Sequence, residues 1–342
     1  MYTRVRSFSK INLGLAVGPA RADGFHGLAT MYQTLALHDF VTVSARASSS
    51  RTIRLTADHR AVPTDARNTA WKMVEGALAR MGVAAEVEID IQKRLPVQGG
   101  MGAGSANAVA ALLGLERELG KALPGPERLK LAAEVGSDVP LFLLGGSVLG
   151  LGRGEEVYPL PDLPATPCVV AIPSVGVSTA QAFRDLDARE TSAESRPALT
   201  FQQHPDKLSE LSRVLAAIWT TDGVDPGLSG ITRPGLRVQQ SDLAENFPLL
   251  TLVRTGIEND FEEVAFSQHP SLRSTKRELM GTDSGGSALY AALSGSGSAL
   301  FGLYGSQADA RAAQQRVQQS GTQAILTETL PRAAYWDTMF AE

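Results

Sequence analysis

The chain is poor in several residue types and patterns, and each shortage excludes a class of protein. A single cysteine, Cys168, excludes an internal disulfide, and the apolar residues at 169–172 indicate a buried small residue rather than a nucleophile. The five histidines, at positions 26, 38, 59, 204 and 269, lack the spacing of metal ligands, so we expect no metal site. No apolar run is long enough to span a membrane, and the N-terminus lacks the apolar core of a signal peptide. We therefore expect a soluble protein of the reducing cytoplasm.

Positive charge is scarce as well. The net charge is −4 over 342 residues, and no basic block is longer than Lys93-Arg94. A protein that binds nucleic acid through its phosphates needs a basic surface. We therefore expect a small-molecule substrate, with neither nucleic acid nor membrane as a partner, and any phosphate binding has to be local. The length allows two domains, and the sequence leaves open a monomer or a homodimer.

Glycine, in contrast, is concentrated in one segment. The stretch from Pro96 to Asn107 has glycines at 99, 100, 102 and 104. It follows a strand-like alternation at 87–91 and precedes apolar residues at helical spacing over 108–119. Glycines let successive backbone N–H groups converge on phosphate oxygens beside the start of a helix. The segment matches neither the P-loop nor the dinucleotide-binding pattern, so the letters alone leave a phosphate cradle and a flexible turn as alternatives.

Hydrophobic periodicity predicts mixed helices and strands in the first half of the chain. The expected strands are at 5–15, 40–43, 52–55 and 87–91, and the expected helices run from Asn68 to Met81, from a Ser105 cap to Gly120, and up to about Gly136. Four prolines crowd residues 159–167, and we place a domain boundary there, because proline-rich connections carry few contacts.

The second half begins with a strand at 168–172 and a helix from about Thr179. After a long insertion at about 186–255 we expect helices near 258–268 and 271–280, strands at 288–294 and 299–304, a helix at 306–319 and a strand at 323–329. This closing β-β-α-β order predicts an α+β domain of ferredoxin type.

Four polar motifs carry residue types that can do chemistry. Lys10 and Asn12 lie two apart on a predicted strand and so share one face. Residues 23–26, Asp-Gly-Phe-His, combine a turn with an aromatic ring and an imidazole that can stack on a planar base and bond its edge. Asp138 follows a helix end, where a carboxylate can act as a base or simply cap a turn. Residues 294–298, Ser-Gly-Ser-Gly-Ser, are either a hairpin turn or a second anion-contacting loop.

In this order the motifs resemble those of the GHMP small-molecule kinases, which have an N-terminal lysine strand, a P-x-x-x-G-x-G-x-x-S type loop and a C-terminal Gly-Ser-Gly-Ser loop. Within that family the chain is most similar to the members that phosphorylate a cytidine diphosphate-linked methylerythritol. The matching segments are Ser9 to Leu13, Arg21 to His26, Lys93 to Pro96, Ser137 to Pro140 and Gly150 to Glu155. The Arg-Ala-Asp-Gly-aromatic-His run is the most specific of these, and the resemblance covers about residues 4–183 and parts of 256–305.

The resemblance implies a fold and an activity. It implies an α+β, two-domain GHMP kinase-like fold, with a ribosomal-S5-like domain over residues 1–162, a ferredoxin-like domain over 163–342 and a cleft between them. It implies transfer of the γ-phosphoryl group of ATP, accompanied by Mg²⁺, to the 2-hydroxyl of the methylerythritol moiety in the non-mevalonate route to isoprenoids.

The resemblance also implies roles for individual residues. Asp138 is the implied general base and Lys10 its cationic partner, while His26 reads the cytosine edge between the rings of Phe25 and Phe183. The implied ATP-binding residues are Asn68, Lys93, Pro96, Gly99, Gly100, Gly102, Gly104 and Ser105. The implied substrate-binding residues are Asn12, Phe25, His26, Phe183, Gly295 and Ser296.

The chain departs from the family pattern at several positions. Phe25 stands in place of the usual tyrosine, which removes a phenol but keeps the stacking face. In the glycine-rich segment, Ala106 replaces the second serine of a pair, and Gln98 and Ala103 replace glycines, so we expect weaker ATP binding. Two other interpretations stay open: a GHMP kinase acting on homoserine or a mevalonate-like acid, and a nucleotide-binding relative without catalysis. The Phe25-His26 pair argues against the first, because those substrates have no base to stack, and the presence of Lys10 with Asp138 argues against the second.

Overall fold

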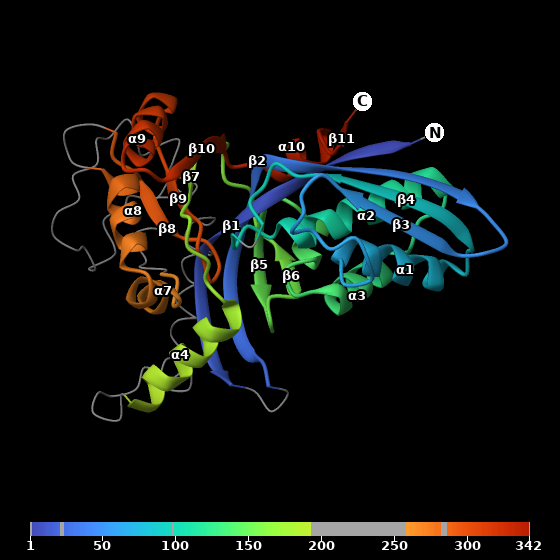
Figure 1. Ribbon diagram of the computed structural model, residues 1–342, viewed down its shortest axis with the longest axis horizontal. Coiled ribbons are helices and arrows are strands. Elements are labelled where there is room, and N and C mark those ends of the chain that lie inside the picture. Colours follow the sequence, from blue (N-terminus) through green and yellow to red (C-terminus); the bar gives the residue numbers. More distant parts are fainter. Residues whose placement is uncertain (1, 21–23, 98, 193–257, 282–285, 342) are drawn as a thin grey trace, which may run out of the picture.

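The computed structural model describes residues 2–20, 24–97, 99–192, 258–281 and 286–341, which form two layered domains side by side (Figure 1). Residues 21–23, Gln98 and most of the expected insertion at 186–255 lie outside this described part. The first domain contains β1 (Thr3–Ala20), β2 (His26–Ala47), β3 (Thr52–Ala57), α1 (Thr69–Met81), β4 (Ala85–Gln92), α2 (Ala103–Leu119), α3 (Gly125–Val135), a 3₁₀ turn (Pro140–Leu143), β5 (Ser147–Leu151) and β6 (Glu156–Pro159).

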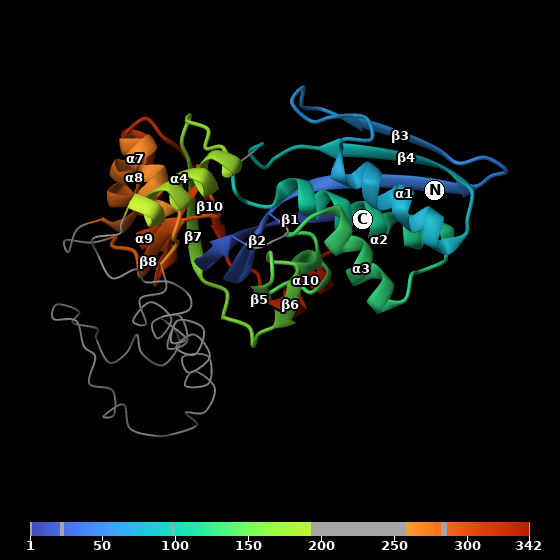
Figure 2. The same ribbon diagram turned by 90° about the horizontal axis from the view of Figure 1, so that it is seen from below.

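The first domain is a sheet covered on one face by helices. Among the described residues its strand order is β11-β1-β2-β4-β3, with β5 paired to β2 and β6 paired to β5. Figure 2 shows α1, α2 and α3 on the same face of the long strands. The alternation predicted at 87–91 is confirmed, because β4 buries every second side chain in the core that these helices cover. This core fixes where β1 and the start of α2 lie, and hence the site described below.

The helix ends test the sequence predictions residue by residue. α1 begins after Asn68, as predicted, and the Asn68 side chain accepts a hydrogen bond from the backbone N–H of Ala70 at 2.9 Å. α2 ends at Gly120, also as predicted. The prediction that Ser105 caps α2 is wrong, because the cap residue is Gly102 and Ser105 lies inside the first turn. Gly102 has a left-handed φ of 69°, a conformation that suits glycine and turns the chain into the helix before it reaches the serine.

The second domain has the ferredoxin-like arrangement that the sequence predicts. It contains β7 (Pro167–Ile172), α4 (Thr179–Ser192), α7 (Glu262–Gln268), α8 (Pro270–Met280), β8 (Tyr290–Leu293), β9 (Leu300–Leu303), α9 (Gln307–Gln319) and β10 (Gln323–Glu328). The strand order is β10-β7-β9-β8, so the last strand lies beside the first. α8 and α9 pack together on the outer side of this sheet (Figure 1).

An apolar cluster joins the two sheets. It packs residues of β1 and β2, among them Ile11 and Leu35, against residues of β7 and β9, among them Val170 and Phe301. Because these side chains are fully buried, separating the domains would expose a core. The two domains therefore hold the residues between them at fixed positions.

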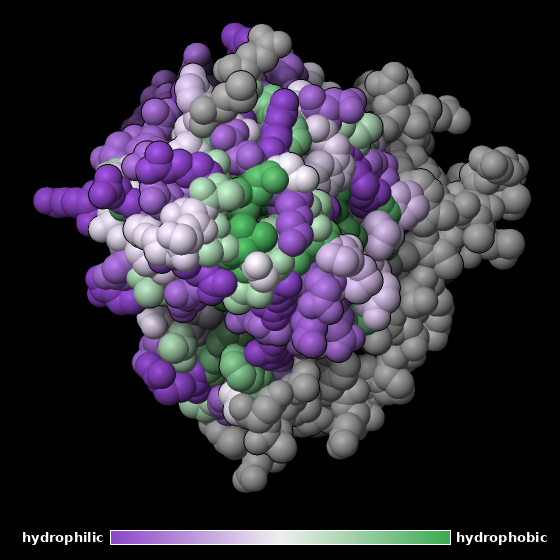
Figure 3. Space-filling view, turned by 90° about the vertical axis from the view of Figure 1, so that its right-hand side faces the viewer, coloured by the Kyte–Doolittle hydropathy of each residue, from purple (hydrophilic) through white to green (hydrophobic). Residues whose placement is uncertain are grey.

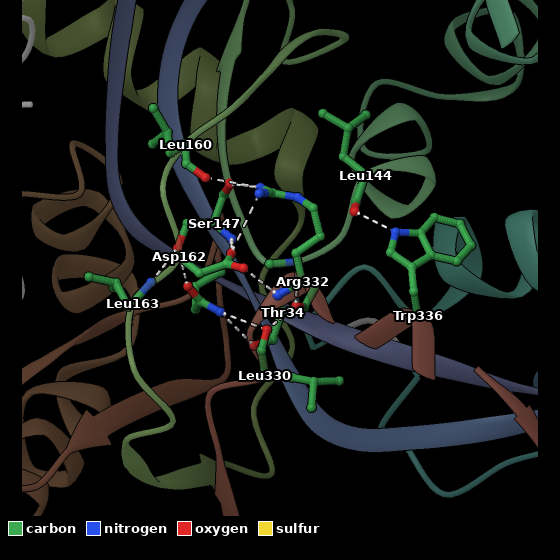
Figure 4. Close-up of polar contacts among 11 residues, drawn as sticks. Thr34, Leu144, Ser147, Leu160, Asp162, Leu163, Leu330, Arg332 and Trp336 are labelled. Carbon is green, nitrogen blue, oxygen red and sulfur yellow. Dashed lines mark hydrogen bonds and ion pairs between the residues drawn. The ribbon is translucent and has the colours of Figure 1, made fainter. Parts of the chain in front are cut away.

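The proline-rich segment between the domains is not the contact-poor connection that we expected. Leu163 is 3% exposed, and the Asp162 carboxylate accepts hydrogen bonds from the backbone N–H groups of Ser147 and Arg332 at 3.2 and 2.7 Å. The Arg332 guanidinium donates to the carbonyl groups of Ser147 and Leu160 at 2.7 and 3.1 Å (Figure 4). Arg332, far away in the sequence, thus holds the proline-rich segment in place. The composition of the segment itself does not indicate these contacts.

The end of the chain returns to the first domain through α10 (Arg332–Asp337) and β11 (Phe340–Ala341). β11 pairs antiparallel with β1, and the Trp336 indole N–H donates to the Leu144 carbonyl at 3.0 Å (Figure 4). Tyr335 and Met339 lie in the core of the first domain. A division of the chain at 162/163 assigns these residues to the second domain, whereas they pack in the first.

Cys168 lies in β7 with no exposed surface. Burial raises the pKa of its thiol far above the usual range, so the reactive thiolate is absent at neutral pH. We expect the native protein to be inert to a chromogenic disulfide reagent and to release one thiol equivalent once it is unfolded in guanidinium. A native protein that reacts as fast as free cysteine would contradict the buried position.

No helix in the described part of the chain is long and apolar enough to cross a membrane. The face of the first domain in Figure 3 is mostly hydrophilic, with apolar residues in a central area and in a smaller area below it. Limited apolar area is ordinary on protein surfaces.

Candidate active site

Lys10 lies at the centre of the candidate site, on β1 between the two domains. Lys10 is 2% exposed. Its Nζ donates to Asn12 Oδ1 at 2.5 Å and lies 3.4 Å from Asp138 Oδ2. The predicted shared face of Lys10 and Asn12 is therefore confirmed, and the structure brings Asp138 to it. Asn12 in turn donates from Nδ2 to Thr30 Oγ1 at 2.7 Å. A buried ammonium with two oxygen partners is held in one place.

Asp138 stands in the turn between α3 and Pro140, with its side chain 33% exposed. Tyr32 donates from its hydroxyl to Asp138 Oδ1 at 3.0 Å, while Oδ2 faces Lys10. Burial, followed by the charge of Asp138, raises the pKa of Tyr32 well above its usual value. Tyr32 therefore stays protonated and keeps donating, so it orients the carboxylate and leaves part of it open to a ligand.

Sequence reasoning missed Tyr32. Its place in the site follows from the pairing of β1 with β2, in which Asn12 lies opposite Tyr32. This register includes shifts between Phe8 and Ser9 and between Asn12 and Gly14. Such bulges move side chains relative to a regular pairing, and their positions are not readable from the letters.

The glycine-rich segment forms a tight turn against the loop at 294–298. Gly100 has a φ of 72°, and its carbonyl accepts a hydrogen bond from Ser294 Oγ at 3.0 Å. A Cβ added at Gly100 would lie 2.2 Å from the Ser294 carbonyl oxygen. The next residue, Met101, accepts from the Lys10 backbone N–H at 3.0 Å. Glycine is therefore required where the two loops meet beside Lys10.

The start of α2 faces this turn with free backbone donors. The first N–H groups of a helix have no partner within the helix, and the helix dipole adds positive potential there. Gly104 and Ser105 lie in this first turn, and the Gly104 carbonyl accepts from Thr69 Oγ1 at 2.5 Å. Such an end can hold an anion near Lys10. Pro96 and Gly99 complete the turn, since a Cβ on Gly99 would lie 3.1 Å from Pro96 Cγ.

Replacing Gly100 with alanine is expected to separate the two loops. The left-handed backbone alone costs an alanine about 1–2 kcal/mol, and the added Cβ collides with Ser294 as described. We expect a lower free energy of unfolding and weaker nucleotide binding, measured by denaturant titration and by calorimetry. Gly125→Ala is the matched control, because no atom lies within 4 Å of a Cβ there and its φ is ordinary. Unchanged nucleotide affinity in Gly100→Ala would mean that this turn does not shape the binding site.

The buried position of residue 106 suits the alanine that stands there in place of the family's usual serine. Its methyl group is 3% exposed and belongs to the hydrophobic core of the first domain. A hydroxyl at this position would need a partner inside that core. Ser105, by contrast, is only partly buried.

Asn68 and Lys93, expected beside the adenosine, already have partners within the protein. Asn68 uses its amide at the cap of α1 and on the Pro63 carbonyl, to which it donates at 2.7 Å. Lys93 Nζ forms an ion pair with Asp39, and the two side chains are 6% and 0% exposed. Asp39 Oδ1 also accepts from the backbone N–H of Leu95 at 2.8 Å. The pair therefore anchors the chain that leads into the glycine-rich turn, and contact with adenosine stays a prediction.

The side chain of Asn259 holds the loop at 294–298 in place. The sequence did not single out Asn259 as a site residue. Asn259 Nδ2 donates to the carbonyl groups of Leu293 and Gly295 at 2.9 and 2.7 Å. A Cβ on Gly295 would lie 3.5 Å from Lys10 Nζ, so this loop also borders the site. Ser296 exchanges a hydrogen bond with a threonine at the start of α4 at 2.7 Å. The loop is thus more than a hairpin turn, because it contacts both the glycine-rich turn and α4.

Three of the predicted substrate residues, Phe25, His26 and Phe183, lie around α4 and the start of β2. The rings of His26 and Phe183 stack at 4.8 Å and 19°. His26 Nε2 lies 2.7 Å from Asp187 Oδ1. Phe25 is half exposed, and the guanidinium of Arg153 lies 4.9 Å from its ring. The structure therefore brings His26 and Phe183 into direct contact, and Asp187 and Arg153 are additional residues that the sequence did not single out.

The arrangement can bind an anion and accept a proton at neighbouring points. The start of α2 and the turn at Gly100 offer backbone donors, Lys10 supplies a buried positive charge, and Asp138 a partly exposed carboxylate. Among the described residues, no group of three or more His, Cys, Asp or Glu side chains could hold a metal ion. A hydroxyl bound beside Asp138 would meet both a proton acceptor and a positive charge.

Comparison with known proteins gives consistent matches. Residues 68–146 match the family of GHMP kinases N terminal domains, and residues 240–323 match GHMP kinases C terminal. The chain is 37% identical over 303 residues to a 4-diphosphocytidyl-2-C-methyl-D-erythritol kinase of Solibacter usitatus. The aligned part covers 89% of this chain and 81% of that relative. It is 32% identical over 324 residues to a protein of the same name from Moorella thermoacetica, with coverages of 95% and 98%.

Solved structures share the fold. A 4-(cytidine 5'-diphospho)-2C-methyl-D-erythritol kinase superposes with a TM-score of 0.65 at 24% identity, over 95% of this chain and 98% of the other. A homoserine kinase from Cytophaga hutchinsonii superposes with a TM-score of 0.63 at 19% identity, over 96% of this chain and 95% of the other. The same fold therefore serves substrates as different as these two.

Proposed function

Because the chain belongs to the GHMP kinase family, we propose that it transfers the γ-phosphoryl group of ATP to the 2-hydroxyl of 4-diphosphocytidyl-2-C-methyl-D-erythritol. The chain is an ATP-dependent small-molecule kinase of that family. The observation that carries the proposal is the buried Lys10 Nζ, 3.4 Å from the partly exposed Asp138 carboxylate and beside the start of α2. The cytidine part of the substrate is supported by the stacked His26 and Phe183 rings and by the relatives' names.

In the reaction the substrate hydroxyl attacks the γ-phosphorus and the bond from that phosphorus to the oxygen of ADP breaks. Asp138 accepts the hydroxyl proton through the carboxylate that Tyr32 and Lys10 orient. Lys10 Nζ balances negative charge that gathers between the reacting groups. Phosphoryl transfer depends mainly on such positioning and neutralisation, because little covalent chemistry falls to the protein.

ATP phosphates would occupy the space before α2. The backbone N–H groups from Gly102 to Ser105 would hold them, with the turn at Gly100 shaping their approach. Mg²⁺ would enter with the nucleotide, and the Ser105 hydroxyl at the start of α2 is an oxygen donor that suits it. The metal would neutralise phosphate charge when bound.

Turnover decides between the candidate functions. The purified protein is incubated with Mg-ATP and 4-diphosphocytidyl-2-C-methyl-D-erythritol, and ADP release and the product mass are followed. We expect ADP release matched by a gain of one phosphate. Homoserine and mevalonate are run in parallel, and phosphorylation of either without the cytidine compound would replace the proposal. Nucleotide binding without any transfer would favour a non-catalytic relative.

The proposed function also includes a location in the cytoplasm. A phosphorylated, cytidine-linked metabolite and a reduced Cys168 both suit the cytoplasm.

A further inference from the structure

The ring of His26 is held by two side chains of α4. Phe183 stacks on its face, with ring centroids 4.8 Å apart, and Asp187 Oδ1 lies 2.7 Å from Nε2. Residues four apart on a helix project from the same side, so one face of α4 fixes both the plane and the rotation of the imidazole. The His26 side chain is 10% exposed and the Asp187 side chain 46%.

The carboxylate also fixes where the imidazole proton sits. An ionised carboxylate only accepts hydrogen bonds, so Nε2 has to carry the proton that joins it to Asp187. In the neutral ring the other nitrogen, Nδ1, then has a lone pair and acts as an acceptor. Nδ1 makes no hydrogen bond to any residue in the described part of the chain.

We propose that Asp187 is a specificity-determining residue that acts through His26, by holding Nδ1 as an acceptor for the exocyclic amino group of cytosine. The inference rests on the proposed function and names how its substrate base is selected. Uracil carries a carbonyl oxygen in place of this amino group. Its lone pairs would face the Nδ1 lone pair, which costs binding energy on both sides.

The expected preference for cytosine over uracil depends on the single hydrogen bond between the base and His26 Nδ1. A ligand that leaves such a buried polar group unpaired, or opposes it, is rejected strongly. We expect a preference for cytosine over uracil of about 10²-fold or more in kcat/KM. We expect the preference in base binding, because the contacts described for His26 and Asp187 include neither Asp138 nor Lys10.

The test exchanges the acceptor for a donor. In Asp187→Asn the amide N–H₂ can donate to Nε2, which favours the tautomer with the proton on Nδ1 and turns that atom into a donor. Cytidine- and uridine-linked substrates are compared under the same conditions, together with calorimetry of CDP and UDP alone. We expect the cytidine preference to fall at least tenfold, mainly through KM and with little change in kcat. Nitrogen-15 spectra of labelled histidine should report the change of tautomer.

Asp185→Asn is the matched control. It removes the same charge from the same helix, but Asp185 bonds to Gln181 and Gln268 rather than to His26. This variant should keep the wild-type preference and tautomer. Circular dichroism checks that all variants are folded.

The outcomes separate the inference from the proposed function. A wild-type enzyme that phosphorylates the cytidine compound, with an Asp187→Asn variant of unchanged base preference and tautomer, overturns the inference alone. If no substrate turns over, the proposed function fails, and CDP and UDP binding still decides the inference. Equal affinity of the wild-type protein for the two nucleotides overturns it.

Discussion

Asp138→Asn is expected to lower kcat by about 10²–10⁴-fold, the usual contribution of a general base, while ATP still binds. The amide keeps the size of the side chain and can still accept from Tyr32, but it cannot take the substrate proton. It also leaves the buried ammonium of Lys10, 3.4 Å from the carboxylate, without its anionic partner. Steady-state kinetics with Mg-ATP and the cytidine-linked substrate measure the loss, and calorimetry measures ATP affinity.

Two further variants locate the cause of that loss. Tyr32→Phe removes only the hydrogen bond of 3.0 Å to Asp138 and should reduce kcat less than the loss of the carboxylate itself. Glu134→Gln removes a nearby carboxylate that pairs with Arg80 on the surface, and it should leave kcat unchanged. Turnover within tenfold of wild type in Asp138→Asn would mean that this carboxylate is not the base.

The contrast between Lys10 and Tyr32 shows what the sequence could predict about the site. Lys10 and Asn12 share a strand, so the period of two along the chain already places them on one face. Tyr32 reaches Asp138 only through the bulged register of β1 on β2, and register is a property of the paired strands. The sequence therefore predicts the local pairs of the site and misses residues that tertiary pairing adds.

The same distinction applies to the fold. The helix ends at Asn68 and Gly120 and the ferredoxin-like strand order were predictable, because caps, glycine and hydrophobic period are local signals. The return of β11 to β1 and the tie between Arg332 and Asp162 join parts of the chain that are far apart. No composition or period marks such contacts. The misplaced cap at Ser105 has a different cause, since serine is the commoner cap and a left-handed Gly102 took its place.

Lys93→Met is expected to lower the free energy of unfolding by about 3–5 kcal/mol, the usual cost of leaving a buried charge without its partner. Asp39 has no exposed side-chain surface, so water cannot replace the ammonium. Asp39 also accepts from the backbone N–H groups of Arg94 and Leu95 at 2.7 and 2.8 Å. Chemical denaturation measures the loss, and Arg94→Met, at the exposed neighbouring residue, should change stability far less.

A double variant separates anchoring from nucleotide contact. Adding Asp39→Asn to Lys93→Met removes the stranded charge, so part of the lost stability should return. If the Lys93 ammonium serves only to anchor the chain before the glycine-rich turn, ATP affinity should recover in parallel with stability. If the ammonium borders the adenosine, ATP affinity should stay low in the double variant although the protein is stable again. A single variant as stable as wild type would mean that the buried pair does not hold this part of the fold, because an unpaired carboxylate in that position has no other cation in its described contacts.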